Sequence, residues 1–385
     1  MNKRVFWVTS LFGYFFGNEK SNTNSPCGTE KPFNKTEKSM THKIPIMKTT
    51  FQITLFSALL FILPGCSTFF EAEPASDPEA MFDNLWTTFD RDYAVFEERG
   101  VNWQQQYDTY RTQVKPSTSD DELYNIFTEM LAPLDDGHVT LVAPNKEIWI
   151  SNTIRREKID DELFSPNVIK SQYLEVDYET DGEQNFIYGK IKNENIGYFH
   201  FANVGQNFFE LQDFLDAYDD VNGYIIDLRH NDGGDFTYCF SEIGRLVDQE
   251  RFVFRSKTKN GPGYDDFTEW FDWSIKPASP YVNKPIVVLI DRFTISAGER
   301  AVMAFDVLPN VLLVGETTNG GQGTQIGREL ANGWFYTLVT QKVELSNGQS
   351  YEGIGLAPDV EMKNTQEDIN AGVDRVLQFA IEELK

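Results

Sequence analysis

The C-terminal half of the sequence alternates short, continuously apolar runs with segments of helical periodicity, and this alternation restricts the fold more than any other feature. The runs are "YIIDLR" (224–229), "PIVVLID" (285–291) and "VLLVGE" (311–316). An apolar run without polar alternation is typical of a strand that is covered on both faces. Such strands, when they alternate with helices, form the layers of an α/β fold. We therefore expect an α/β core over residues 195–385.

The region before this core predicts a small helical domain over residues 79–138. Asp77 and Pro78 mark a helix start, because a capping side chain precedes a proline at the first helical position. Apolar residues at helical spacing then predict further helices near 102–113 and 120–132.

Residues 139–194 carry weaker signals and are expected to form a small strand-rich linker region. Its candidate strands are "VTLVAP", "SQYLEVDY" and "NFIYGKI". At the other end of the chain, "WFYTLVTQKVEL" predicts paired strands and "DINAGVDRVLQFAIEEL" predicts one final helix.

The N-terminal end has the layout of a bacterial lipoprotein signal. "MKTTFQITLFSALLFILPGCS" combines an early lysine, an apolar stretch and small residues before Cys66. Residues 47–65 are therefore interpreted as a signal peptide, residues 66–78 as a tether, and residues 1–46 as a doubtful leader. Cys66 would carry lipid and anchor the protein in the cell envelope. A buried helix ending in an ordinary cysteine is less favoured, because residues 49–65 hold no charge.

Charge and cysteine content exclude several classes of function. The formal net charge is −25, so nucleic acid and anionic lipid surfaces would be repelled, and a covalent lipid is the expected membrane tether. The three cysteines, Cys27, Cys66 and Cys239, cannot build a disulfide framework or a cysteine-based metal site. We expect no metal and no cofactor, and Cys239 is interpreted as a buried small apolar residue.

Ser296 lies directly behind the apolar run 285–291, in "RFTISAGERA", and has two interpretations. With Glu299 it forms the S-x-x-E pattern of a capping box. A serine between a strand and a helix is also how hydrolases expose a nucleophile beside free amide donors. Ser119 and Glu122 repeat the pattern before an ordinary amphipathic run, so capping alone would explain it.

Catalysis would need a base and oxyanion donors elsewhere in the chain. His200 lies inside an apolar strand and favours a core role, whereas His230 in "DLRHNDGGD" could line a site. His138 in "LDDGHVTL" lies at a helix–strand junction. Gly233 and Gly234 would let backbone N–H groups approach a ligand closely, which suits an oxyanion hole. The alternative is that they only form a tight strand-to-helix turn. "NGGQGTQIG" (319–327) lacks the residues of a nucleotide-binding loop.

Five motifs taken in order resemble the tail-specific peptidases, which include the C-terminal-processing proteases and the core of tricorn protease. They are "LDDGHVTL", "GYIIDLRHNDGG", "IDRFTISAGE", "VGETTNGGQG" and "YEGIGLAPDV", and the resemblance covers roughly residues 79–385. It implies a Clp-protease/crotonase-like core behind an N-terminal helical domain, and serine peptidase activity on a peptide or protein substrate.

The resemblance also distinguishes two catalytic arrangements. The processing branch places a lysine where this chain has Gly321, and no lysine occurs between residues 285 and 341. The tricorn-like branch uses a histidine and a glutamate, matched here by His138 and Glu352. It implies Ser296 as nucleophile, His138 as general base and acid, and Glu352 as the holder of the imidazole. The serine that precedes the histidine in tricorn is Gly137 here.

The resemblance further implies that backbone N–H groups of Ala297 and of Gly233 or Gly234 bind the oxyanion. Activity would then rise with pH through an apparent pKa of about 6–7. Residues 145–195 leave room only for a diminished PDZ module or none. The rival interpretation is a catalytically silent binding protein of the same fold for small apolar ligands or peptides.

Overall fold

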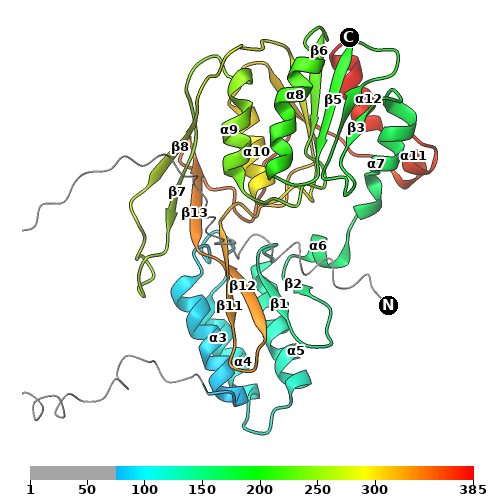
Figure 1. The fold of residues 1–385 in the computed structure, drawn as a ribbon. Helices are drawn as coiled ribbons and strands as arrows, with labels where there is room; N and C mark the ends of the chain where they lie inside the picture. Colours follow the sequence, from blue (N-terminus) through cyan, green and yellow to red (C-terminus); the bar gives the residue numbers. More distant parts are fainter. Residues whose placement is uncertain (1–74) are drawn as a thin grey trace, which may run out of the picture. The chain divides into compact units, whose positions relative to one another are not determined.

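The computed structural model describes residues 75–385. The doubtful leader, the signal peptide, Cys66 and most of the tether lie outside this range. A seven-stranded sheet forms the core, and its four neighbouring strands β10, β9, β6 and β5 run parallel (Figure 1). In sheet order the strands are β14 (Val360–Glu361), β10 (Val311–Gly315), β9 (Ile286–Ile290), β6 (Gly223–Asp227), β5 (Ile196–Phe201), β4 (Phe186–Lys190) and β3 (Glu179–Thr180). The predicted α/β core is confirmed.

Helices cover both faces of this sheet. On one face lie α8 (Glu210–Ala217), α9 (Phe236–Glu242) and α10 (Ala297–Asp306), and on the other lies α12 (Arg375–Glu383). Successive strand residues alternate between the two layers, so that Ile226 packs with the first layer and Ile225 with α12. Because both faces are buried, the strands are apolar throughout.

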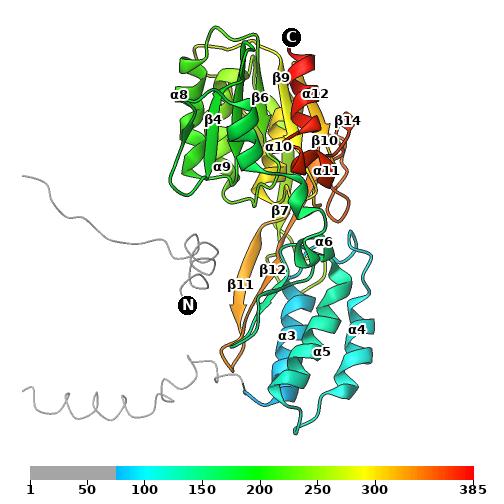
Figure 2. The ribbon, with the colours of Figure 1, turned by 90° about the vertical axis from the view of Figure 1, so that its right-hand side faces the viewer.

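A second layer is built by the N-terminal helices on a four-stranded sheet (Figure 2). The helices are α3 (Pro78–Asp92), α4 (Trp103–Tyr110) and α5 (Asp120–Leu131), and the strands in order are β11 (Gln325–Glu329), β12 (Phe335–Val339), β1 (Thr140–Val142) and β2 (Trp149–Ile150). Asp77 caps α3, and Ser119 and Glu122 form a complete capping box on α5. The residues of β11 and β12 follow the core strands in sequence but pack with the helical layer.

Three short elements differ from the sequence-based expectations. The first residues of "SQYLEVDY" belong to a π-helical turn, Ile169–Tyr173, in which the N–H of Leu174 donates to the carbonyl of Ile169 at 3.2 Å. Ile169 and Tyr173 pack with α12. The expected final helix is broken into α11 (Gln366–Asn370) and α12, because Gly372 takes a φ of 72° and Asp374 caps a new helix.

The third difference concerns "WFYTLVTQKVEL", whose two strands belong to different sheets. β12 lies in the four-stranded sheet, whereas β13 (Gln341–Leu345) begins a three-stranded sheet with β7 (Arg251–Thr258) and β8 (Phe271–Ile275). In the expected linker region, β3 and β4 extend the core sheet itself. Within residues 75–385, no helix is both long and apolar enough to cross a membrane.

Candidate active site

Ser296 lies at the sharp turn between β9 and α10, with a φ of 62° and a ψ of −124°. A non-glycine residue at positive φ costs on the order of 1–3 kcal/mol, so neighbouring contacts must hold it there. The N–H of Ser296 donates to the carbonyl of Gly321 at 2.8 Å, and the N–H of Ile295 donates to the carbonyl of Asn231 at 3.1 Å. This strained strand–turn–helix geometry is the one that exposes a nucleophile in hydrolases.

The expected capping role of Ser296 is wrong. Its side chain makes no capping hydrogen bond, although its position is the N-cap of α10. Glu299 is buried, and its carboxylate accepts the Thr318 hydroxyl at 2.6 Å and the N–H of Gly321 at 2.7 Å. The physical reason is the positive φ of Ser296, which is outside the extended conformation that an N-cap residue normally takes. The Ser296 hydroxyl is therefore not used as a cap.

The turn at Gly233 and Gly234 lies beside the nucleophile. A Cβ added to Gly233 would lie 2.5 Å from Cβ of Ser296, and both glycines have positive φ, 83° and 137°. The N–H of Gly233 already donates to the Asn231 side chain at 3.0 Å. Among the hydrogen bonds of residues 75–385, the N–H groups of Gly234 and Ala297 have no acceptor. They are the two donors that remain for an oxyanion.

His138 follows α5 and its short extension, directly before β1, and its side chain is buried. A Cβ added to Gly321 would lie 3.3 Å from His138 Nδ1, so the imidazole lies against the position where the processing branch carries a lysine. Within the described part of the chain, neither ring nitrogen has a hydrogen-bond partner. Burial lowers the pKa of His138 to about 4, which keeps the imidazole neutral at neutral pH.

Glu352 is also buried, but its partners differ from those expected. Its Oε1 accepts a hydrogen bond from Arg99 at 2.6 Å, and its Oε2 accepts the N–H groups of Gln322 at 2.8 Å and Gly323 at 3.1 Å. Burial raises the pKa of Glu352, although Arg99 opposes this shift. The structure thus joins Glu352 to the glycine-rich turn and to Arg99, and within residues 75–385 no hydrogen bond or ion pair joins Glu352 to His138.

Asp136 is the carboxylate that lies beside His138. Its Oδ1 is 3.8 Å from Nδ1 of the imidazole and accepts the backbone N–H of His138 at 2.8 Å. The hydroxyl of Tyr93 donates to its Oδ2 at 2.8 Å. Sequence reasoning missed this residue, although the "DDGH" spelling placed an acid two residues before the histidine. It also missed Arg99, for which the sequence gives no signal.

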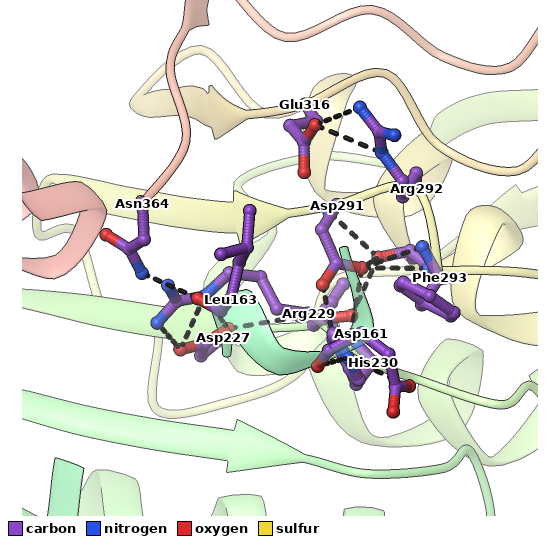
Figure 3. A network of polar contacts seen from close by, with 12 residues as sticks. Asp161, Leu163, Asp227, Arg229, His230, Asp291, Arg292, Phe293, Glu316 and Asn364 are labelled. Atoms are coloured by element: carbon purple, nitrogen blue, oxygen red, sulfur yellow. Dashed lines mark hydrogen bonds and ion pairs between the residues drawn. The ribbon is translucent and has the colours of Figure 1, made fainter. Parts of the chain in front are cut away.

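His230 and His200 have structural partners. Figure 3 shows His230 in a polar network, where Nδ1 contacts Asp291 Oδ2 at 2.5 Å and Nε2 contacts the carbonyl of Asp161 at 3.0 Å. Asp291 also accepts the N–H of Phe293 at 3.0 Å, so this network ties the turn after β6 to the turn that leads to Ser296. His200 Nε2 contacts the carbonyl of Arg229 at 3.1 Å inside the sheet.

Two other residues bear on the choice between catalytic arrangements. Lys342 is the lysine nearest in sequence to the glycine-rich turn that holds Gly321. Its amine forms an ion pair with Glu98 at 2.8 Å. A Cβ added to Gly137 would lie 2.4 Å from Cδ1 of Ile295, so the serine found in tricorn would require this side chain to move. Cys239 is buried and free, and within residues 75–385 no three His, Cys, Asp or Glu residues are grouped to hold a metal ion.

Two family models and several known proteins match parts of this chain. Residues 195–362 match peptidase family S41, and residues 74–132 match the tricorn protease C1 domain. The carboxy-terminal processing protease CtpA of Bacillus subtilis is 29% identical over 178 residues, which cover 46% of this chain and 36% of that protein. A carboxyl-terminal-processing protease of Picosynechococcus is 32% identical over 137 residues, which cover 35% of this chain and 31% of that protein.

A solved structure of a candidate peptidase from Parabacteroides merdae shares the fold over a longer range. It is 29% identical, has a TM-score of 0.72, and the match covers 80% of this chain and 97% of that one. By contrast, this chain spans about a third of the length of the two curated relatives above. From these matches and the core described above, the chain carries a domain of peptidase family S41 at residues 195–362, preceded by a tricorn protease C1 domain at residues 74–132.

Proposed function

We propose that this chain is a serine endopeptidase of the cell envelope that hydrolyses peptide bonds in unfolded or C-terminal segments of proteins. The observation that supports this most is the strained conformation of Ser296 beside two backbone donors, Gly234 and Ala297, that have no acceptor among residues 75–385. A strained serine with an unused hydroxyl has no stabilising role that would explain its cost. The family matches support the same class of reaction.

In this proposal, His138 takes the proton of the Ser296 hydroxyl as Oγ attacks the carbonyl carbon of the scissile bond. The N–H groups of Gly234 and Ala297 stabilise the oxyanion of the tetrahedral intermediate. His138 then gives its proton to the leaving nitrogen, and water hydrolyses the acyl-enzyme by the same route. A ring shift must bring His138 to Ser296, as is common in structures without substrate.

Glu352 completes a Ser–His–Glu arrangement through the turn rather than by direct contact with the imidazole. It binds the N–H groups of Gln322 and Gly323, and the preceding Gly321 lies against His138. The carbonyl of Gly321 also holds the N–H of Ser296. Loss of Glu352 would therefore displace both reacting residues.

Labelling with a fluorophosphonate tests the proposal. The wild-type protein should be labelled at Ser296 and should cleave an unstructured polypeptide. Ser296→Ala and His138→Ala should each lose about 10⁴-fold or more in kcat, and the double variant should be little worse because the two residues act as a unit. Cleavage by folded Ser296→Ala at the wild-type rate would exclude Ser296 as the nucleophile.

A silent binding protein for small apolar ligands or peptides is the second candidate. Its support is that both His138 ring nitrogens lack hydrogen-bond partners within the described range. This candidate predicts that wild-type protein binds an unstructured peptide, measured by fluorescence anisotropy, without labelling or cleavage.

The location also belongs to the proposal. Cys66 ends the "LPGC" motif that follows an apolar stretch. In this proposal the chain is cleaved between Gly65 and Cys66, and the sulfur of Cys66 is acylated. Mass spectrometry of the membrane-extracted protein should then find lipid on Cys66 and no peptides from residues 1–65. A soluble protein with an unmodified Cys66 would contradict the anchor.

A further inference from the structure

The imidazole of His138 needs a hydrogen-bond partner that the expected arrangement does not give it. The side chain is 3% exposed, and neither Nδ1 nor Nε2 has a partner among the described residues. A buried polar group without a partner is costly, and a general base also needs its second nitrogen fixed so that the correct tautomer faces the nucleophile. A carboxylate close to one ring nitrogen would meet both needs.

Glu352 is poorly placed for this task, because within residues 75–385 no hydrogen bond or ion pair joins it to His138, and its oxygens bind other groups. Oε1 accepts from Arg99 at 2.6 Å, and Oε2 accepts from two backbone N–H groups of the glycine-rich turn. To reach His138, the carboxylate would have to abandon a buried ion pair and two hydrogen bonds. Such a loss inside a protein is strongly unfavourable.

Asp136 is better placed. Its Oδ1 lies 3.8 Å from Nδ1 of His138, and a small ring movement would bring this to hydrogen-bond distance. The same oxygen accepts the backbone N–H of His138 at 2.8 Å and can accept a second hydrogen. The aspartate side chain is fully buried, so water does not compete for the oxygen.

Two residues of the C1 domain fix Asp136 in this position. The Tyr93 hydroxyl donates to Oδ2 at 2.8 Å, and the Arg99 guanidinium lies 3.5 Å from Oδ1. Arg99 also donates to the carbonyl of Asp135 at 2.8 Å and to the carbonyl of Gly320 at 2.7 Å. Arg99 therefore links Asp136, Glu352 and the two segments that carry them.

We propose that Asp136 is the positioning carboxylate of His138, and that Tyr93 and Arg99 of the C1 domain hold it in place. Asp136 accepts the Nδ1–H, which leaves Nε2 unprotonated and available for the Ser296 hydroxyl. Glu352 instead fixes Arg99 and the turn beside the imidazole. This inference rests on the proposed peptidase function, and it makes the C1 domain part of the catalytic arrangement.

The test compares matched amide variants. Asp136→Asn should lower kcat for an unstructured polypeptide by about 10²–10⁴-fold with little change in KM, because an amide cannot hold the same tautomer. The control is Asp135→Asn, the same chemical change one residue away. The Asp135 side chain is exposed and accepts the N–H of Thr153 at 2.7 Å, so the kcat of Asp135→Asn should stay within about threefold of wild type.

The tautomer of His138 can be measured directly, and a purely structural role of Asp136 would leave it unchanged. In ¹⁵N spectra of histidine-labelled protein, His138 should carry its proton on Nδ1, with the signal assigned by its loss in His138→Gln. Asp136→Asn should abolish this preference, whereas Glu352→Gln should keep it. Retained activity and tautomer in Asp136→Asn, with both lost in Glu352→Gln, would overturn the inference.

Tyr93→Phe provides a second variant in case Asp136→Asn does not fold. It removes only the hydroxyl on Asp136 Oδ2, and should lower kcat by about 3–10-fold with KM unchanged. Unchanged kcat and tautomer in folded Tyr93→Phe would count against the inference. Failure of the peptidase proposal looks different: either the wild-type protein does not cleave the polypeptide, or Ser296→Ala cleaves it as fast as wild type, whatever Asp136→Asn does.

Discussion

Glu299 and Glu352 bind successive pairs of N–H groups on one turn. Glu299 accepts those of Gly320 at 3.1 Å and Gly321 at 2.7 Å, and Glu352 accepts those of Gln322 at 2.8 Å and Gly323 at 3.1 Å. Consecutive N–H groups that converge in this way form an anion-binding nest. Here the anions are two buried carboxylates of the chain itself, which accounts for a glycine-rich motif without any nucleotide.

The strained backbone of Ser296 lowers the stability of the folded protein, so a variant that relieves the strain should be more stable although it is inactive. Ser296→Gly should unfold at higher urea concentration than Ser296→Ala, with a difference of about 1 kcal/mol, because glycine adopts a φ of 62° without steric cost. Both variants should fail to react with a fluorophosphonate. If Ser296→Gly is less stable than Ser296→Ala, the positive φ is not a source of strain.

The oxyanion donors are best tested at Ala297. Gly233 and Gly234 both have positive φ, so proline would distort the turn there. Ala297 is the first residue of α10, where proline is tolerated and removes only the N–H. Ala297→Pro should lower kcat by about 10²–10³-fold.

Ala297→Ser is the matched control for this donor, because it keeps the N–H and should remain close to wild-type activity. Circular dichroism of both variants checks that α10 is intact. Near-normal turnover in folded Ala297→Pro would remove this N–H from the mechanism.

The low pKa of His138 moves the expected acid limit of activity. The sequence alone predicts that activity rises through an apparent pKa of about 6–7, near that of free imidazole. Burial lowers the pKa of His138 to about 4, so kcat/KM should stay flat down to about pH 5 and fall only below it. A titration of kcat/KM between pH 4 and 8 measures this, and a midpoint near 6.5 would show that the imidazole is solvated in the working enzyme.

The same shift has a consequence for stability. The unfolded chain binds a proton on this histidine below its ordinary value of 6.5, while the folded chain excludes it until about 4. The contribution of His138 is therefore present above pH 6.5 and is lost as pH falls toward 4, by an amount of about 3 kcal/mol. His138→Gln should lose less stability than wild type over this window in urea titrations.

Glu352 should act in the opposite direction. Burial raises its pKa above the ordinary 4.5, although Arg99 opposes the shift. As pH falls, the folded chain therefore takes up a proton on Glu352 before the unfolded chain does, and above the raised pKa Glu352 is the anion that pairs with Arg99. Its contribution is thus present below pH 4.5 and declines as pH rises through the raised value. Glu352→Gln should flatten the fall in unfolding free energy on the alkaline side of pH 4.5. An unchanged slope would mean that Arg99 keeps the carboxylate ionised throughout.

The sequence by itself determined the core strands, most of the helices and the identity of the turns around Ser296. Apolar runs such as 285–291 are strands wherever both faces are covered, and Asp77 with Pro78 specifies a helix start locally. Ser119–Glu122 and Ser296–Glu299 have the same S-x-x-E pattern but different structures, so the local sequence does not decide the role of this pattern. Only the first pair is a capping box.

Only the tertiary structure decided what the second pair does. Ser296 has a positive φ, and its N–H donates to the carbonyl of Gly321 in the glycine-rich turn. Glu299 accepts N–H groups of that same turn instead of capping the helix. Likewise the partners of Glu352 and Asp136 include Arg99, which is 253 residues before Glu352 in the chain. Buried charges and N–H groups are satisfied by whichever partners the packed layers bring near, and no spacing along the sequence encodes that choice.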